Sequence, residues 1–443
     1  MAPVLSKPIP SYFSHSLISN PSVLEQFLAP VLHVLHDYTR GGFDCPAITD
    51  EDFLRLGCLR VLAQVRSGRD FIQQQQEVFD RDLKRASFFN LLHSSRRGDL
   101  LAECAYQVFL HGSQRVRQQG ADLLAAFPAL QGRAVWAADG HHIAHACHAL
   151  RDHKGGRVPP KSLYLLCLHT GLLHNLCPVQ GEGVWRHEMP VFRERLPTWL
   201  QRRPGRKGSR PPILVLDPAF VDQAFWSRMK QLGQAGAVMI TRLKANMRPI
   251  IQGDTAWDRH APINQGVQSD CWVRFDHGGR LRRIEYVDPE TGETYVFLTT
   301  VEDLEPGLLA WLYLLRWRIE KVFDTGKNKL QETKAWASGE VAQGIQGHFF
   351  ALTHNLLVLF RSYLQAEHGL EEVKLKVKHQ RALAARQARA HQNGRAVHPL
   401  HAHMPAVVQL SLQFIRSLRN AISRDLTLAA ALPRLNAMLT AYL

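Results

Sequence analysis

Hydrophobic and polar residues alternate differently in successive parts of the chain. In the first 130 residues, apolar side chains recur every three to four positions, a spacing that predicts amphipathic helices. These stretches cover residues 23–35, 52–65, 71–83 and 100–110, and Pro, Gly and Asp separate them. We therefore expect a mostly helical N-terminal domain.

The pattern changes near Gly132, where short apolar runs bounded by turn residues begin. Such runs predict strands, and they cover residues 134–139, 162–169, 172–179, 213–217 and 237–241. Helical periodicity separates the later runs, over residues 188–201 and 221–232. Three strands, a helix, a strand, a helix and a strand predict a mixed α/β sheet with helices on its faces.

Strand patterns alone follow, at residues 271–275, 280–287 and 294–301. Helical periodicity returns over residues 305–330 and again from residue 341, with a basic, His-containing interruption near residues 391–405. These shifts predict five parts. They are a helical domain (1–130), the first part of an α/β core (131–246), a β-rich insertion (247–305), the closing helices of the core (306–365) and a basic helical C-terminal region (366–443).

The charge of the chain is unevenly distributed. It has 443 residues with 54 Lys+Arg and 39 Asp+Glu, a net charge of +15. Residues 1–130 are neutral overall, residues 131–350 carry 29 − 22 = +7, and residues 351–443 carry 12 − 4 = +8. Basic clusters lie at residues 201–210 and 374–395. This excess favours an acidic partner such as nucleic acid; a basic surface that only aids solubility is the alternative.

Other features of the sequence exclude several classes of protein. Seven cysteines, an odd number without CxxC spacing, argue against a disulfide framework and a thiolate zinc site. The N-terminal residues lack the basic and apolar regions of a secretory signal. Polar residues interrupt the longest uncharged stretches, so we expect no membrane-spanning helix.

Two acidic residues stand at the ends of predicted strands. Asp139 ends one apolar run and Asp217 ends another. A carboxylate at the end of a strand in an α/β fold points into the crevice where ligands usually bind. Each Asp taken alone could equally cap a turn or a helix.

A third acid lies within a predicted helix. At about 100° per residue, Tyr313, Arg316, Glu320 and Lys327 fall within an arc of roughly 60°. The stripe combines an aromatic hydroxyl, two cations and a carboxylate. An ordinary salt-bridged surface would explain the pair Arg316–Glu320, but not the Tyr and the Lys at its two ends.

This segment, YLLRWRIEKVFDTGK, resembles the Tyr-x2-Arg-x3-Glu-x6-Lys motif of bacterial insertion-sequence transposases of the DDE type. The residues around Asp217 and those at 236–246 are also similar to that family, and Asp139 stands in the place of its first acid. The resemblance covers residues 132–364. It implies an RNase H-like core interrupted by a β-rich insertion.

The resemblance also implies an activity. Asp139, Asp217 and Glu320 would hold two Mg²⁺ ions, for which Mn²⁺ can substitute, to cut DNA at element ends and join it to target DNA. Mg²⁺ prefers such hard oxygen ligands, and two ions suit in-line displacement. Tyr313, Arg316, Lys327, Arg242 and Lys244 would contact DNA. Trp317 would stack on an unpaired base or, equally well, pack in the core.

The resemblance further implies double-stranded DNA as the partner, namely terminal inverted repeats and target DNA. A dimer or larger assembly would bridge two ends, in the bacterial cytoplasm at the nucleoid. The neutral N-terminal domain would then need a local basic face to bind an element end, which we place around residues 81–97.

The chain departs from the family pattern at two positions. His141 stands where a hydroxyl residue is usual, and Pro218 stands where Arg is frequent. These departures leave open two alternatives, a DNA-binding descendant without catalysis and a related nuclease without strand transfer. Asp222 and Asp324 are less favoured candidates for the metal-binding acids. The histidines at 141, 142, 145 and 148 suggest zinc, but no further ligand accompanies them, and chance clustering is the better explanation.

Overall fold

The computed structural model describes most of the chain, and every structural statement below concerns these residues. They are residues 20–38, 48–65, 67–79, 85–143, 150–151, 157–158, 160–179, 187–203, 210–276, 279–371, 373–394 and 410–440. The predicted loop cluster at 201–210, the basic interruption at 391–405, His145 and His148 lie wholly or mostly outside them.

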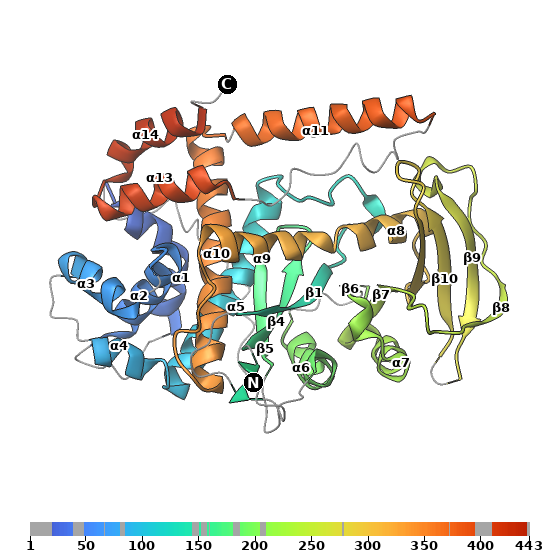
Figure 1. The fold of residues 1–443 in the computed structure, drawn as a ribbon, viewed down its shortest axis with the longest axis horizontal. Helices are drawn as coiled ribbons and strands as arrows, with labels where there is room; N and C mark the ends of the chain where they lie inside the picture. The colour runs from blue at the N-terminus through green and yellow to red at the C-terminus, as the bar shows by residue number, and fades with distance from the viewer. Residues whose placement is uncertain are drawn as a thin grey trace.

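The predicted elements appear in the predicted order, and the helix at residues 85–91 and the short strands at 150–151 and 157–158 are additions that the sequence did not predict (Figure 1). The helices are α1 (Val23–Tyr38), α2 (Asp50–Leu62), α3 (Gly68–Phe79), α4 (Arg85–Leu91), α5 (Ser95–Gln118), α6 (Glu188–Arg202), α7 (Gln223–Gln231), α8 (Pro306–Leu314), α9 (Trp317–Lys329), α10 (Glu340–His368), α11 (Val373–Gln392), α13 (Leu412–Ser423) and α14 (Leu428–Thr440). The strands are β1 (Val135–His142), β2 (Leu150–Arg151), β3 (Arg157–Val158), β4 (Lys161–Cys167), β5 (Leu173–Pro178), β6 (Ile213–Leu216), β7 (Val238–Arg242), β8 (Ile250–Asp254), β9 (Val267–Arg274), β10 (Leu281–Val287) and β11 (Thr294–Thr299).

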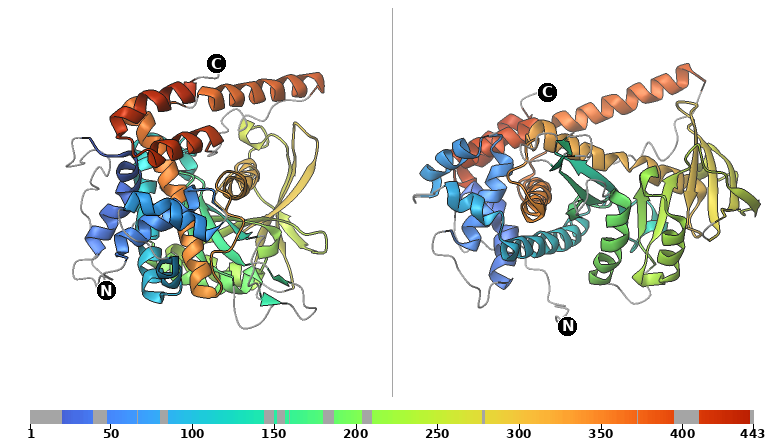
Figure 2. Two further views of the ribbon diagram at one scale, coloured as in Figure 1. Left: turned by 60° about the vertical axis from the view of Figure 1, so that its left-hand side comes forward. Right: turned by 60° about the horizontal axis from the view of Figure 1, so that its bottom comes forward.

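A nine-stranded mixed sheet runs through the molecule in the order β5-β4-β1-β6-β7-β11-β10-β9-β8. Strand β1 pairs antiparallel with β4 and parallel with β6, and β6 pairs parallel with β7. Helices α8 and α9 lie on one side of this sheet, and α6 and α7 lie on the other (Figures 1 and 2). The predicted mixed α/β class is therefore confirmed.

The β-rich segment continues this sheet. Strand β11 pairs antiparallel with β7, which joins the segment edge to edge with the core strands. Strand β8 at the far edge was not predicted from the sequence. Its five residues are all exposed, including Ile250 and Ile251, so it lacks the alternation that marks a half-buried strand.

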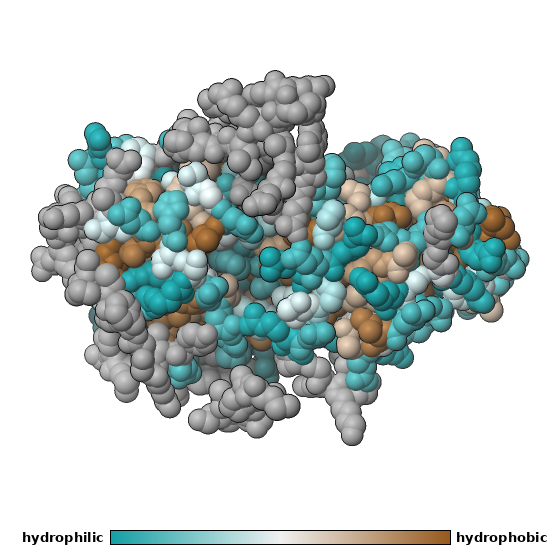
Figure 3. Space-filling model, turned by 90° about the horizontal axis from the view of Figure 1, so that it is seen from below, coloured by the Kyte–Doolittle hydropathy of each residue, from teal (hydrophilic) through white to brown (hydrophobic). Residues whose placement is uncertain are grey.

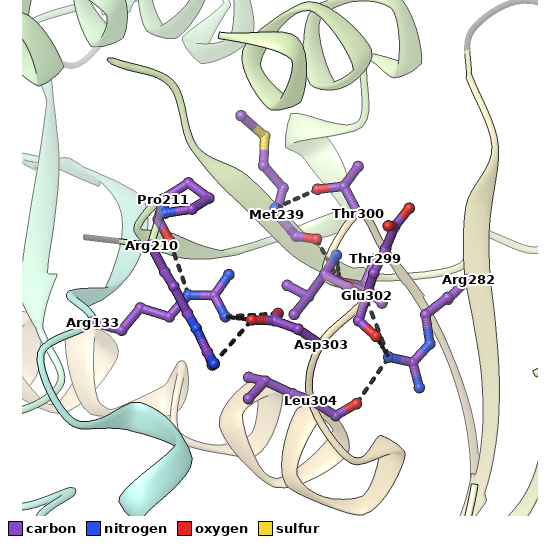
Figure 4. A network of polar contacts seen from close by, with 11 residues as sticks. Arg133, Arg210, Pro211, Met239, Arg282, Thr299, Thr300, Glu302, Asp303 and Leu304 are labelled. Atoms are coloured by element: carbon purple, nitrogen blue, oxygen red, sulfur yellow. Dashed lines mark hydrogen bonds and ion pairs between the residues drawn. The ribbon is translucent and has the colours of Figure 1, made fainter. Parts of the chain in front are cut away.

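Buried arginines fix the connection from β11 to α8 (Figure 4). Arg133, just before β1, donates from Nη1 to Asp303 Oδ1 at 2.8 Å and from Nε to the carbonyl of Pro211 at 2.8 Å. Arg282 of β10 donates to the carbonyl of Leu304 at 2.9 Å. Residues far apart in the sequence therefore hold the start of α8 against the sheet.

The N-terminal helices share one hydrophobic core with α10 and the sheet. Gly57 of α2 permits this packing, because a Cβ at that position would lie 2.0 Å from the ring of Phe349 in α10. The chain start also meets the C-terminal helices, since the amide of Val23 donates to the carbonyl of Leu426 at 2.9 Å. The two ends of the described chain thus stabilise one another.

The outer surface is mixed in character. Seen from below, hydrophobic residues are scattered among hydrophilic ones (Figure 3). None of the helices within the described ranges combines the length and the apolar character needed to cross a membrane.

The basic face expected around residues 81–97 lies partly outside the described residues, which begin again at Arg85. Arg97 is buried and donates to the carbonyls of Ile48 and Thr49 at 2.6 and 3.1 Å. Arg96 pairs with Asp50 at 2.6 Å. Both arginines therefore hold the start of α2 against α5. The buried Arg97 adds nothing to a basic surface, whereas Arg96 keeps 43% of its side chain exposed.

Candidate active site

The sheet brings the first two predicted acids side by side. In the parallel pair β1–β6, Ala138 is the partner of Leu216, and Asp139 and Asp217 are the next residues of the two chains. Asp217 follows the last residue of β6, and Asp139 lies where the pairing of β1 with β6 ends, although β1 itself continues to His142 against β4. Both acids thus lie where the parallel pairing ends, and α/β folds commonly bind ligands at the carboxyl ends of parallel strands. The apolar, β-rich runs that precede the two acids are fully buried, which fixes their positions.

Backbone hydrogen bonds orient both carboxylates. Asp139 Oδ1 accepts from the amide of Gly140 at 2.8 Å, and Asp217 Oδ1 accepts from the amide of Ala219 at 2.9 Å. The second bond caps a short 3₁₀ helix, η2 (Pro218–Phe220). Asp217 therefore does cap a turn, but with one oxygen only, and Pro218 starts that turn. The Oδ2 atom of each Asp is left to face the site.

The predicted helix over residues 305–330 is interrupted in the structure. Helix α8 ends at Leu314 and α9 begins at Trp317. Arg316 donates its amide to the carbonyl of Tyr313, and Ile319 donates to that of Arg316, both at 3.0 Å. These i→i+3 bonds tighten the turn, so the 100° spacing does not extend across the junction. The single 60° stripe was wrong as a description of one continuous helix.

This junction places Arg316 among all three acids. Its Nη1 lies 3.2 Å from Asp139 Oδ2, and its Nη2 lies 2.9 Å from Glu320 Oε1 and 3.9 Å from Asp217 Oδ2. The Arg316 side chain is 7% exposed, whereas Asp139, Glu320 and Asp217 are 20%, 33% and 37% exposed. The tertiary structure thus gathers three predicted acids around the guanidinium of a fourth predicted site residue.

Charge and burial act against each other in this cluster. Burial raises the pKa of Asp139 to about 6, although Arg316 and the amide of Gly140 favour its charged form. Burial works to lower the pKa of Arg316, but Tyr313 and the three carboxylates outweigh burial and raise it. The guanidinium therefore stays charged, and Asp139 can change its charge near neutral pH.

The three carboxylates fit a hard divalent cation in their chemistry, because Mg²⁺ and Mn²⁺ prefer oxygen ligands. Within the described residues, however, no three His, Cys, Asp or Glu side chains are grouped closely enough to hold one metal ion together. The carboxylates converge on the guanidinium of Arg316, so metal ligation needs a rearrangement of that side chain.

The other predicted site residues surround this cluster at different depths. Tyr313 is buried, and its ring packs 5.0 Å from that of Phe297. Trp317 is 56% exposed, which favours a role in contact with a ligand over packing in the core. The guanidinium of Arg316 lies 5.8 Å from the Trp317 ring.

The remaining predicted DNA contacts lie farther out on strand and helix ends. Arg242 ends β7, is exposed, and lies 5.4 Å over the ring of Tyr295. Lys244 follows β7 and is half-buried. Lys327, also half-buried, lies on α9 close enough to His141 to disfavour its charged form.

His141 has a packing role in the structure. Its ring stacks on Phe323 of α9 at 4.6 Å and on Phe350 of α10 at 5.8 Å. Burial, with help from Lys327, lowers the pKa of His141 to about 3, so the ring is neutral. His141 therefore joins β1 to the helix that carries Glu320. Of the four clustered histidines, His142 is exposed, and the other two lie outside the described residues.

Sequence reasoning missed Glu188, the first residue of α6. Its Oε1 lies 1.7 Å from the place that a Cβ on Gly140 would take, and it pairs with Lys161 at 2.5 Å. Glu188 also raises the pKa of Asp139. Two sequence signals point to Glu188. It is an acid at the start of a predicted helix, and the Asp139-Gly140 pair leaves room beside the first acid for another side chain.

The two less favoured acids have other roles. Asp222 caps α7 through the amide of Phe225 at 2.9 Å and pairs with Arg193. Asp324 is exposed and accepts from Asn328 at 2.6 Å. Neither contacts Arg316.

In comparisons with known proteins, no model of a protein family matches the sequence, and no curated protein matches it.

Proposed function

We propose that this chain is a DNA transposase of an insertion sequence, of the DDE type, with an RNase H-like core. In this proposal it cuts phosphodiester bonds at element ends and joins them to target DNA. Asp139, Asp217 and Glu320 are the proposed ligands of two Mg²⁺ ions, or of Mn²⁺ in their place.

One observation carries the proposal. Three acids that the sequence predicted, in β1, directly after β6 and in α9, have side-chain oxygens within 4 Å of the same guanidinium. Residues 139 and 316 are 177 positions apart in the chain, so local sequence patterns cannot bring them together by themselves. The strand and helix order, with three antiparallel strands (β1, β4 and β5) followed by two parallel crossover strands (β6 and β7), also supports an RNase H-like core.

The chain's own residues have separate roles in this mechanism. When bound, a metal pair supplies Lewis-acid activation of the attacking oxygen and charge stabilisation of the leaving oxygen. The amides of Gly140 and Ala219 hold the carboxylates of Asp139 and Asp217 in fixed orientations, so these two carboxylates need little reorganisation. Tyr313 and Lys327 are the proposed phosphate contacts, and Trp317 is a proposed stacking surface for an unpaired base.

Helix α11 is the proposed surface for the duplex backbone. It carries six Lys and Arg residues and no acid, and Lys378, Arg381 and Arg389 are exposed. The helix extends from the α13–α14 side of the molecule toward the β-rich end, where Arg386 pairs with Glu290 (Figures 1 and 2). An exposed helix with charge of one sign is suited to counterion release from DNA.

The test uses purified full-length protein, Mg²⁺ and duplexes that carry the DNA on either side of the gene. We expect the wild type to nick and join these duplexes. Glu320→Gln is expected to bind them with unchanged affinity but to cut at least about 1,000-fold more slowly, because one metal ligand loses its charge. The matched control is Glu340→Gln at the exposed start of α10, which should cut normally.

The outcomes separate the proposal from its alternatives. Normal cutting by Glu320→Gln would show that Glu320 is not a ligand. A wild type that binds DNA without cutting would instead indicate a non-catalytic DNA-binding descendant. Cutting without any joined product would indicate a nuclease.

A further inference from the structure

Arg316 has more acidic partners than one guanidinium can balance. Its two Nη atoms contact three carboxylates, so the ionised cluster carries 1 − 3 = −2. The oxygens that face it on Asp139 and Asp217 are those that the backbone amides leave free. A partly buried cluster with this excess charge attracts a further cation.

Arg316 is also held only by the end of its side chain. Its Nε is buried without a hydrogen-bond partner among the described residues. It stands at the junction between α8 and α9, next to the exposed ring of Trp317. Moving the guanidinium away from the carboxylates therefore requires no hydrogen bond at Nε to break.

We propose that Arg316 acts as an internal counter-cation that competes with a divalent metal ion for the same three carboxylates. This inference rests on the proposed function insofar as it takes these carboxylates to be metal ligands. While Arg316 is in place, it keeps the acids assembled and reduces their mutual repulsion. When a divalent ion takes their free oxygens, Arg316 is released and becomes available to a substrate phosphate, for which a guanidinium is well suited.

The first test measures binding of Mn²⁺ alone to the full chain, by the electron paramagnetic resonance signal of the free ion. Arg316→Met keeps the length of the side chain and removes its charge. We expect it to bind Mn²⁺ about tenfold more tightly than the wild type, within the range of typical coupling between two binding events. Arg316→Lys should fall between the two, because Lys keeps the charge but cannot reach three carboxylates as a fork does.

A second variant, Asp139→Asn, separates a failure of the proposed metal site from a failure of the proposed competition. We expect it to lose at least tenfold in Mn²⁺ affinity, as roughly expected for a missing charged ligand. If Asp139→Asn binds Mn²⁺ like the wild type, no metal occupies this cluster and the proposed function fails with it. If Asp139→Asn binds weakly while Arg316→Met equals the wild type, only the competition is overturned.

The second test is thermal unfolding in chelator and in Mg²⁺. Arg316→Met should unfold at a lower temperature than the wild type in chelator, because the acids then repel one another. Addition of Mg²⁺ should raise its unfolding temperature more than it raises that of the wild type. Arg282→Met removes a buried arginine outside the cluster. Mg²⁺ should raise its unfolding temperature no more than it raises that of the wild type. An equal gain in all three proteins would overturn the competition.

The third test concerns the release of Arg316. Duplex DNA affinity is measured by fluorescence anisotropy in chelator and in Ca²⁺. Wild-type affinity should rise several-fold in Ca²⁺, and Arg316→Met should show a smaller rise. An equal rise in both would show that the released guanidinium does not bind phosphate.

Discussion

Two buried arginines in this molecule have opposite surroundings. Arg282 of β10 is 2% exposed and forms a two-pronged contact with the fully buried Asp270. It also donates to the carbonyls of Val301, Glu302 and Leu304, and Figure 4 shows Glu302 and Leu304 beside it. Arg316 faces three carboxylates, and its Nε lacks a partner among the described atoms.

The difference concerns the balance of charge. Arg282 has one acid and several neutral acceptors, so its site is neutral and its donors are used. Such a site contributes to the fold, and breaking it leaves a charge buried without compensation. The Arg316 site has excess negative charge at a strand edge, partly open to solvent. We infer that the neutral charge balance around Arg282 marks a structural arginine, and that the excess negative charge around Arg316 marks a functional one.

The largest predicted effect on stability is at Arg282. Arg282→Met leaves Asp270 without a counter-charge, so the free energy of unfolding should fall by about 3–5 kcal/mol. Urea unfolding measures this change. Adding Asp270→Leu should recover most of the loss, because both charges are then gone. A loss below about 1 kcal/mol for the single variant would erase the distinction between the two sites.

A smaller effect is predicted for charge on the open surface. Replacing Lys378, Arg381 and Arg389 of α11 by Glu should reduce duplex affinity. It should also lower the slope of log affinity against log salt concentration by about 3, because each phosphate contact contributes about 0.9 to that slope. Mn²⁺ affinity should not change. The matched control reverses the exposed Arg416 of α13, Arg424 directly after α13 and Arg434 of α14. Equal slopes for the two triple variants would show that α11 is not a DNA contact.

The smallest effect involves a buried acid that does not touch Arg316. Glu332 accepts from Gln346 at 2.8 Å, and burial raises its pKa to about 7. The folded state therefore keeps a proton that the unfolded chain releases above its ordinary pKa. Stability should fall as pH rises from about 4.5 to 7 and stay lowered above that range, by about 3 kcal/mol. Glu332→Gln should remove this dependence, as measured by urea unfolding at several pH values. A wild type and variant with parallel profiles would contradict the assignment.

Local patterns predicted most elements of the fold. The seven elements from β1 to β7 in the main sheet and its crossovers appear in the predicted order, as do the first helices. Periodicity suffices here because burial imposes a period of 2 on strands and 3.6 on helices. It failed at β8, which has no buried face, and at residues 315–316, where the turn tightens.

The sequence by itself determined which residues could do chemistry: Asp139, Asp217, Glu320 and the basic residues near them. Only the tertiary structure decided their relation. The parallel register of β1 and β6 put two acids at one edge, and the α8–α9 junction aimed Arg316 at them. It also buried Arg97 and brought Glu188 against Gly140. Periodicity is a property of neighbouring residues, whereas the convergence of charges depends on strand register and helix packing between distant segments.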